Sequence, residues 1–296
     1  MEWDPTQFFR DDHTPNPFAL LILNQPINER AFRVLKRHAK VTLCADGGAN
    51  RFYSMMKAHD RESIDLPDLI IGDLDSITPD TRSHYANLGV RIIEDEDQYS
   101  TDFTKCLDYL RAHVGEFLSP STSSSGSSIS KLEGEGRELD VLILGGLGGR
   151  VDQAFSQIHH LYSMTQSYSS SSSSTGGHST SNQEGTGKIG NLYLISEESI
   201  TFILRPGRNT IQTPGTNRPG ISSAEYLLEE NVGIIPLLGP ARITTSGFQW
   251  DVVDWKTEIG GQLSTSNHIR SDVVTVESLI PVLFTLELAG RLKRDR

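Results

Sequence analysis

Residues 69–76 read Leu-Ile-Ile-Gly-Asp-Leu-Asp-Ser, a short apolar run that stops at a glycine and two aspartates. A run of this length, bounded by turn residues, is typical of a buried strand. We therefore expect Asp73 and Asp75 to leave the carboxyl end of a strand toward the same opening. Two carboxylates this close repel each other by a few kcal/mol at a partly buried site, unless a cation such as Mg²⁺ lies between them. The alternative interpretation is a solvated acidic turn that caps the next helix.

The alternation of a short apolar run with a helical pattern repeats on both sides of this stretch. Further strands are predicted at residues 18–23, 41–45, 90–93, 141–144 and 192–195. Apolar residues recur at helical spacing between them. This pattern predicts an α/β fold: a parallel sheet with helices on both faces, Rossmann-like in its arrangement. Because the strand–helix connections of such a sheet leave at one edge, the polar residues that end the strands should meet there.

Three other loops are expected at this edge: Asp46 to Asn50, Asp97 to Asp102, and Gly145 to Gln153. The second loop opens a helix, whose N-terminus favours phosphate, and Lys105 lies one turn inside it. The third is a glycine-rich turn that can surround a phosphate with backbone N–H groups, although it matches no dinucleotide or Walker pattern. The alternatives are an ordinary helix capped by the Thr101 hydroxyl, and glycines that only allow close packing.

From residue 199 the pattern changes to short segments with period-two alternation. Strands are predicted at residues 201–204, 210–212, 232–238, 241–245, 247–253, 273–277 and 282–286. They indicate a smaller all-β domain, an antiparallel sandwich or barrel. Within it, Trp250 lies near amide and hydroxyl groups and can stack on a flat cationic heterocycle. A core tryptophan is the competing interpretation.

The predicted organisation has three parts. Residues 1–17 form an N-terminal leader, residues 18–198 the α/β domain, and residues 199–296 the β domain. Residues 119–136 and 165–187 are dominated by serine and glycine. Because such segments bury too little apolar surface to fold, we expect both to be disordered surface insertions in the α/β domain.

Composition narrows the classes of protein. The 296 residues carry 38 acidic and 27 basic side chains, a net charge of −11, so nucleic-acid binding has little electrostatic support. The two cysteines, Cys44 and Cys106, form no disulfide or zinc pattern. The N-terminus lacks the features of a signal peptide, and the apolar runs are too short to span a bilayer. We expect a soluble, cytoplasmic protein without a nucleic-acid or membrane partner.

Six motifs in order resemble the eukaryotic thiamine pyrophosphokinase family. They are Asp46-Gly-Gly-Ala-Asn50, Gly72-Asp-Leu-Asp-Ser76, Asp97-Gln98 followed by Thr101-Asp102-Phe103, Leu144-Gly-Gly-Leu-Gly-Gly-Arg150-Val-Asp152-Gln153, Gly247-Phe-Gln-Trp250-Asp251 and Ser264-Thr-Ser-Asn267. The resemblance implies a homodimer that transfers the β,γ-diphosphate of ATP to the hydroxyl of thiamine, giving thiamine diphosphate and AMP. It also implies active sites shared between the two subunits.

The resemblance further implies roles for individual residues. The catalytic set would be Asp46, Asp73, Asp75 and Asp102, of which Asp73, Asp75 and Asp102 would hold Mg²⁺. Gln98, Thr101, Lys105, Gly146, Arg150, Asp152 and Gln153 would line the ATP site. Trp250, Ser266 and Asn267 would bind thiamine. The proton of the thiamine hydroxyl would pass to Asp73 or Asp102.

Two other functions are compatible with parts of the pattern. A phosphohydrolase would use Asp73 as its nucleophile, since Asp-x-Asp after a strand also marks that chemistry. A non-catalytic nucleotide-sensing module would bind ATP tightly without turnover. The phosphohydrolase needs no tryptophan-bearing β domain, whereas the β domain of the sensing module would contact a partner.

Overall fold

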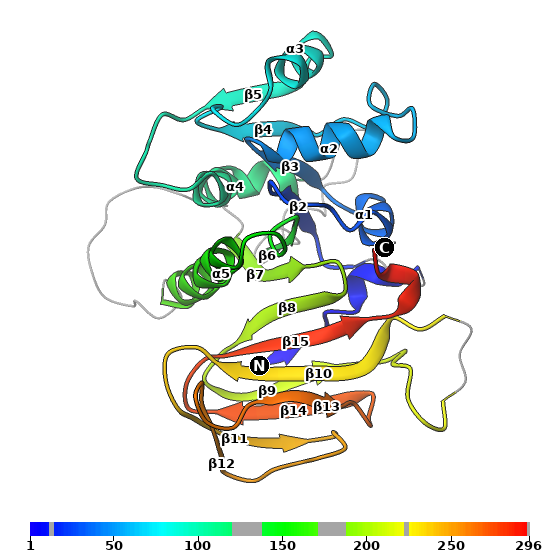
Figure 1. The fold of residues 1–296 in the computed structure, drawn as a ribbon, viewed down its shortest axis with the longest axis vertical. Helices are drawn as coiled ribbons and strands as arrows, with labels where there is room; N and C mark the ends of the chain where they lie inside the picture. Colours follow the sequence, from blue (N-terminus) through cyan, green and yellow to red (C-terminus); the bar gives the residue numbers. More distant parts are fainter. Residues whose placement is uncertain (12–14, 120–137, 171–187, 222–224, 295–296) are drawn as a thin grey trace, which may run out of the picture. The chain divides into compact units, whose positions relative to one another are not determined.

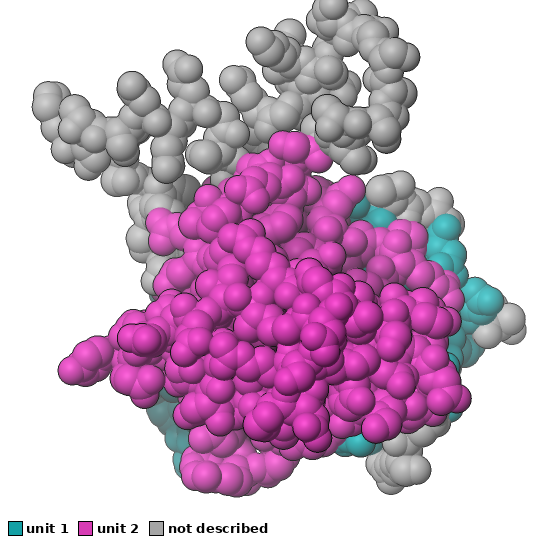
Figure 2. Space-filling model, turned by 90° about the horizontal axis from the view of Figure 1, so that it is seen from above, with its two compact units in different colours: residues 1–15, 28–35, 193–296 teal, residues 16–27, 36–192 magenta. Residues whose placement is uncertain are grey.

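The computed structural model describes residues 1–11, 15–119, 138–170, 188–221 and 225–294. The chain divides into two compact units, coloured separately in Figure 2. Unit 1 comprises residues 1–15, 28–35 and 193–296, and unit 2 comprises residues 16–27 and 36–192. No helix within the described ranges is long and apolar enough to cross a membrane.

Unit 2 is built on a sheet with strand order β7-β6-β2-β3-β4-β5 (Figure 1). The strands are β2 (Phe18–Ile22), β3 (Val41–Ala45), β4 (Leu69–Gly72), β5 (Arg91–Glu94), β6 (Glu138–Leu144) and β7 (Lys188–Ile195). The β2–β3, β2–β6, β3–β4 and β4–β5 pairs are all parallel. All five residues of β2 and of β3 are buried, and since successive side chains point to opposite faces, both faces of the sheet are covered. The predicted α/β fold class is confirmed.

Helices connect these strands. They are α2 (Gly48–Lys57), α3 (Pro79–Asn87), α4 (Asp102–Leu118) and α5 (Val151–Ser170). The Thr78 and Thr101 hydroxyls cap α3 and α4 by accepting the N–H of Thr81 and Thr104, which satisfies a backbone donor that the first helical turn leaves free. In chain order, α2, α3, α4 and α5 each follow the carboxyl end of a parallel strand: β3, β4, β5 and β6.

Unit 1 contains two groups of strands. One has the order β13-β10-β15-β8 and continues to the end of β7; the other has the order β1-β9-β14-β11-β12. The strands are β1 (Glu2–Trp3), β8 (Ser199–Leu204), β9 (Gly207–Gln212), β10 (Leu228–Pro236), β11 (Ala241–Ser246), β12 (Trp255–Thr257), β13 (Ser264–His268), β14 (Val273–Ser278) and β15 (Val282–Leu288). Unit 1 also holds most of helix α1 (Glu29–Lys36) and two short 3-10 turns, Gln7–Phe9 and Gly290–Leu292.

Aromatic side chains join the two groups of strands in unit 1. The ring of Trp3 on β1 lies 4.9 Å from that of Phe202 on β8, and Phe202 lies 5.5 Å from Phe284 on β15. All three side chains are buried. Edge-to-face and tilted contacts at these distances stabilise a core beyond the area they bury. The two sheets thus pack face to face, as expected for a β-sandwich.

The first residues of the chain depart from the expected polar leader. Strand β1 pairs in parallel with β9, and the Trp3 indole N–H donates to the Asn209 side chain over 2.9 Å. Phe8 and Phe9 are buried as well. Apolar residues in an irregular stretch give no periodic signal, so the sequence does not reveal that they complete a core.

Two segments have a different local structure from the prediction. Residues 247–253, expected as a strand, form a turn, and the strands that follow are β12 and β13. In the second expected insertion, residues 165–170 belong to α5, and the buried Thr165 hydroxyl donates to the Leu161 carbonyl over 2.7 Å. This bond lets a polar residue continue a helix. The remainder of that insertion, and residues 120–136 of the first, lie outside the described residues.

Asp140 on β6 is a buried carboxyl at the edge of the sheet opposite the aspartate loops. It is 3% exposed, and its Oδ1 accepts the Asn191 N–H over 2.7 Å. Space around it is tight, because a Cβ at Gly190 would lie 2.3 Å from the same oxygen. Burial, with a smaller contribution from the charge of Glu138, raises the pKa of Asp140 to about 7.

We therefore expect Asp140→Asn to change how stability depends on pH. A carboxyl whose pKa is higher in the folded than in the unfolded state binds more protons when folded, so its folded state loses stability as pH rises toward that pKa. Asparagine keeps the acceptor for Asn191 and removes the titration. In urea unfolding, the free energy of unfolding of the variant relative to that of the wild type should rise by about 2 kcal/mol between pH 5 and pH 8. Parallel pH profiles would mean that Asp140 is solvated.

Candidate active site

Three aspartates meet at the carboxyl edge of the sheet in unit 2. Asp46 follows β3, Asp73 follows β4, and Asp102 is the first residue of α4. One carboxylate oxygen from each lies within 4.8 Å of those of the other two. The carboxyl edge is where open α/β sheets bind ligands. We call these three residues the acidic cluster.

Asp46 fixes the loop that carries the sequence motif. Its two carboxylate oxygens accept the backbone N–H groups of Ser76 and Ile77, each over 2.9 Å, and its side chain is 1% exposed. Asp46 itself has a φ of 36° and Leu74 a φ of 62°, in a region that non-glycine residues rarely adopt. The short acidic loop is therefore held in a tight, strained conformation by a carboxylate from the neighbouring strand.

Gly72 leaves the space in which the cluster assembles. A Cβ at this position would lie 2.6 Å from the Asp46 Cβ and 2.9 Å from Asp102 Oδ1. Since heavy atoms of non-bonded groups do not approach so closely, any larger residue would push the two aspartates apart. The glycine in the motif is thus explained by packing against two members of the cluster.

Asp102 interacts with both the negative charge of Asp73 and the positive charge of Lys105. Burial, followed by the negative charge of Asp73, raises the pKa of Asp102, while Lys105 lowers it. Burial is also the main cause that raises the pKa of Asp46. The Lys105 ammonium is 4% exposed and donates to the Asp95 carbonyl at 2.9 Å and to Asp102 at 3.4 Å. This buried cation contacts Asp102, one of the three carboxylates of the cluster, so the cluster suits a further cation.

Asp75, expected beside Asp73 as a metal ligand, is exposed and is not among the three aspartates of the acidic cluster. Its backbone N–H donates to Asp73 Oδ1 over 3.3 Å, and its carboxylate accepts the Ser76 hydroxyl over 2.7 Å. A side chain alternates direction along an extended stretch, but the loop turns at Leu74. This turn, which the spacing of the two aspartates does not reveal, breaks the alternation that would point both side chains the same way.

The loop before α4 is ordered by Asp97. Its carboxylate accepts the Tyr99 N–H over 2.9 Å and the Ser100 hydroxyl over 2.6 Å. The bond from Ser100 contributes most to lowering the pKa of Asp97, and the bond from Tyr99 adds to it. The Gln98 amide reaches Asp73 Oδ2 over 3.5 Å. Thr101 caps α4. The structure thus brings Gln98, Lys105 and the acidic cluster together, as the sequence predicts.

The glycine-rich turn before α5 is exposed beyond its first residues. Arg150 pairs with Asp152 over 2.5 Å, Gly146 is buried, and Gln153 is exposed. Gly145 has a φ of 69°, and a Cβ there would lie 2.6 Å from the Leu23 carbonyl. The turn therefore packs closely on the loop that follows β2.

The loop after β2 also belongs to this edge, although no sequence motif marks it. A Cβ at Gly47 would lie 2.4 Å from the Asn24 side chain, and one at Gly149 would lie 2.6 Å from the Gln25 side chain. Both residues follow a parallel strand, so the rule that placed the other loops also places Asn24 and Gln25 at the carboxyl edge. Their amide groups are further polar groups beside the glycine turns.

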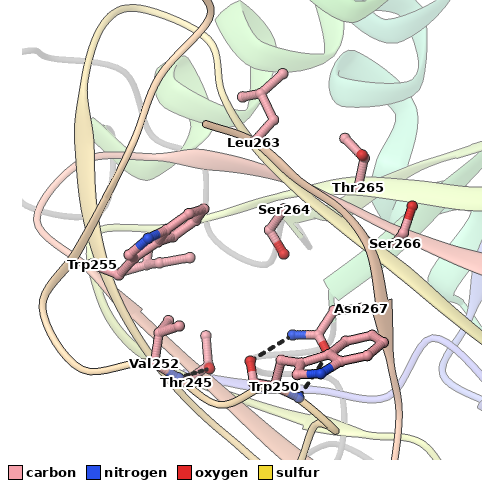
Figure 3. Close-up of a pocket in the computed structure, with 10 residues that line it drawn as sticks. Thr245, Trp250, Val252, Trp255, Leu263, Ser264, Thr265, Ser266 and Asn267 are labelled. Carbon is pink, nitrogen blue, oxygen red and sulfur yellow. Dashed lines mark hydrogen bonds between the residues drawn. The ribbon is translucent and has the colours of Figure 1, made fainter. Parts of the chain in front are cut away.

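Unit 1 holds a pocket beside β11 and β13. Its lining, drawn as sticks in Figure 3, consists of Ile243, Thr245, Trp250, Val252, Trp255, Leu263, Ser264, Thr265, Ser266 and Asn267. Apolar walls with a few hydroxyl and amide groups are typical of small-molecule sites. Trp250 is 53% exposed, so the interpretation as a core tryptophan is wrong.

Hydrogen bonds hold the backbone of the turn that carries Trp250 at residues 247–250. The Asn267 side chain accepts the Trp250 N–H over 3.1 Å and donates to the Trp250 carbonyl over 2.9 Å (Figure 3). Asp251 accepts the N–H groups of Gly247 and Phe248. Asn267 is 7% exposed, so its amide is occupied in fixing the turn.

Comparisons with known proteins connect both sites to one family. Residues 32–171 match the family model "Thiamin pyrophosphokinase, catalytic domain", and residues 220–283 match "Thiamin pyrophosphokinase, vitamin B1 binding domain". The first range contains the acidic cluster, and the second contains every residue that lines the pocket, Trp250 included. The chain is 31% identical to thiamine pyrophosphokinase 1 of Arabidopsis thaliana over 284 residues, 93% of this chain and 88% of that protein.

Fungal proteins give the same result. The chain is 30% identical to the thiamine pyrophosphokinase of Saccharomyces cerevisiae over 285 residues, 86% of this chain and 80% of that protein. The solved structure of thiamin pyrophosphokinase from Candida albicans superposes with a TM-score of 0.73 at 27% identity, covering 97% of this chain and 92% of that one. The chain therefore belongs to the thiamin pyrophosphokinase family of diphosphotransferases.

Proposed function

We propose that the protein transfers the β,γ-diphosphate of ATP to the hydroxyl of thiamine in a Mg²⁺-dependent reaction, giving thiamine diphosphate and AMP. The observation that carries this proposal is the acidic cluster, with carboxylate oxygens of Asp46, Asp73 and Asp102 within 4.8 Å of one another in the part that matches the catalytic domain. Transfer of a phosphoryl-type group depends on charge neutralisation and in-line positioning more than on a covalent intermediate.

The residues present fit Mg²⁺. Carboxylate oxygens are hard ligands, which this ion prefers, and it is usually bound through few carboxylates together with substrate phosphates. Asp73 and Asp102 would hold it, with Asp46 beside them. Asp75 stays a candidate ligand through its exposed carboxylate. When bound, the ion neutralises charge on the transferred phosphates.

The chain's own residues bind and orient the two substrates. Lys105 compensates part of the charge of Asp102, and the Gln98 amide orients Asp73. The N-terminus of α4 and the glycine-rich turn supply backbone N–H groups for phosphate oxygens, and Arg150, Asp152 and Gln153 extend the ATP site from the start of α5. Asp73 or Asp102 accepts the proton of the thiamine hydroxyl.

Thiamine binds at the pocket of unit 1. The exposed indole of Trp250 stacks on its cationic ring system, a contact that tryptophan makes better than the other aromatic residues. Hydroxyl groups of Ser264 and Ser266 line the same pocket. Asn267 contributes through the turn that it holds.

The test is AMP release from ATP and Mg²⁺ with and without thiamine. AMP and thiamine diphosphate should appear together, and only when thiamine is present. Release of inorganic phosphate from small phosphoesters without a second substrate would favour the phosphohydrolase instead. Tight ATP binding without any turnover would favour the nucleotide-sensing module.

A cytoplasmic homodimer with active sites shared between subunits completes the proposal. Two free, buried thiols, Cys44 and Cys106, are usual in a reducing compartment. The acidic cluster and the Trp250 pocket lie in different compact units, so one complete site can take each half from a different subunit.

Complementation between inactive variants tests the shared site. In a heterodimer of Asp73→Asn and Trp250→Ala, one site collects both lesions and the other has none, which follows from two-fold symmetry. Up to about half of the wild-type activity per dimer should return. Heterodimers purified through two different tags are assayed beside each homodimer. No recovery in verified heterodimers would mean that each site is built from one subunit.

A further inference from the structure

Trp250 has a fixed backbone but a half-exposed ring. Asn267 and Asp251 hold the turn, yet hydrogen bonds to the backbone leave the χ1 and χ2 torsions of the indole unconstrained. An exposed side chain that must be immobilised when a ligand binds weakens the affinity by its lost rotamer freedom. The orientation of the ring therefore depends on what lies against it.

The ring beside Trp250 is the imidazole of His268. The two ring centroids lie 5.1 Å apart with an interplanar angle of 47°. His268 is the last residue of β13, directly after Asn267, and its backbone carbonyl accepts the Gln249 N–H over 2.8 Å. Strand and turn are thus tied together at the place where the two rings meet.

His268 is in turn held by charged and polar neighbours. Its Nδ1 lies 3.0 Å from the Gln249 side-chain oxygen, 3.2 Å from Arg270 Nη2 and 3.6 Å from Glu230 Oε1. Arg270 also pairs with Glu230 over 2.5 Å, so its charge is compensated next to a ring that is proposed to receive a cation. His268 itself is 24% exposed at its side chain. The imidazole has little freedom to move.

We propose that His268 is a positioning residue for Trp250: held by Glu230, Arg270 and Gln249, it keeps the indole in the orientation that stacks on a flat cationic substrate. This inference rests on the proposed thiamine site. His268 acts through Trp250 and lies outside the residues that line the pocket.

Thiamine binding to the whole protein, measured by calorimetry without ATP, tests the proposal. His268→Ala should weaken binding roughly three- to ten-fold, the scale of immobilising one side chain. His268→Phe keeps a flat ring beside Trp250 but loses every partner of Nδ1, so it should recover only part of that loss. In turnover assays the KM for thiamine should rise while kcat and the KM for ATP stay close to wild type. The matched control is His113→Ala, which removes a ring stacked on Tyr109 at 3.9 Å in unit 2 and should leave thiamine binding unchanged.

A double-mutant cycle separates positioning from direct contact. If His268 acts through Trp250, adding His268→Ala to Trp250→Ala should cause no further loss, because the ring that it positions is already absent. Full additivity, or wild-type binding by His268→Ala, would overturn the positioning role. Wild-type binding by Trp250→Ala would instead overturn the thiamine site itself. Should His268→Ala not fold, Gln249→Leu carries the test, since it removes a partner of Nδ1 and should weaken binding in the same way to a smaller degree.

Discussion

Asp73→Asn is expected to lower Mg²⁺-dependent turnover at least ~100-fold, the scale on which electrostatic groups act in catalysis. The substitution keeps the size of the side chain and removes one charge from a cluster whose oxygens lie within 4.8 Å. Because it also relieves repulsion with Asp102, thermal unfolding should occur at the wild-type temperature or above. The measurement is the steady-state rate of Asp73→Asn and of the wild type across a Mg²⁺ titration.

Asp108→Asn is the matched control for this prediction. Asp108 lies on the same helix, α4, and is exposed, so the same chemical change there should leave the rate unaltered. Asp75→Asn, measured beside it, tests whether the exposed carboxylate of the motif is also a ligand. Wild-type turnover by Asp73→Asn would remove Asp73 from the metal site.

Gly72→Ala is expected to damage activity and stability together. Its methyl group would lie 2.6 Å from the Asp46 Cβ and 2.9 Å from Asp102 Oδ1, so the two aspartates must separate. Overpacking of this kind lowers the free energy of unfolding by about 1–3 kcal/mol. We expect turnover at a fixed Mg²⁺ concentration to fall by roughly ten-fold or more, with partial recovery at higher Mg²⁺.

Gly233→Ala is a suitable comparison, because the nearest heavy atom to its Cβ would be at 3.7 Å, an ordinary contact. It should change neither the Mg²⁺ requirement nor the rate. If Gly72→Ala had the wild-type Mg²⁺ requirement, the cluster would have to tolerate the displacement, and its geometry would not determine activity.

The sequence predicts those parts of the fold whose signal is local. The runs of β2, β3 and β4 are buried throughout and apolar except for Thr42, so their strands and the parallel sheet follow from pattern alone. The edge at which Asp46, Asp73 and Asp102 meet follows from the topology.

Other features depend on contacts between distant residues. Residues 247–253 look like a strand because several are apolar, but Asp251 accepts two backbone N–H groups of the turn and Gly247 has a φ of 94°. Trp3 and Phe8 join a core formed by strands about 200 residues later in the chain. Nothing in their local sequence distinguishes them from a leader.

The arrangement of the acidic cluster also depends on contacts that its sequence motif does not reveal. The spacing of Asp73 and Asp75 suggests two equivalent ligands, whereas Leu74 adopts a positive φ of 62° and the third carboxylate of the cluster comes from Asp46. A backbone conformation that is unusual for leucine is set by bonds from Asp46 to Ser76 and Ile77. These bonds cross between two strands and have no signature in either motif.

The central claim is transfer of an intact diphosphate, and ATP labelled at its β-phosphorus tests it most directly. With Mg²⁺ and thiamine, the label should pass into thiamine diphosphate, and unlabelled AMP should form in an equal amount. Label that remains in ADP while thiamine monophosphate accumulates, or inorganic phosphate formed without thiamine, would contradict the account.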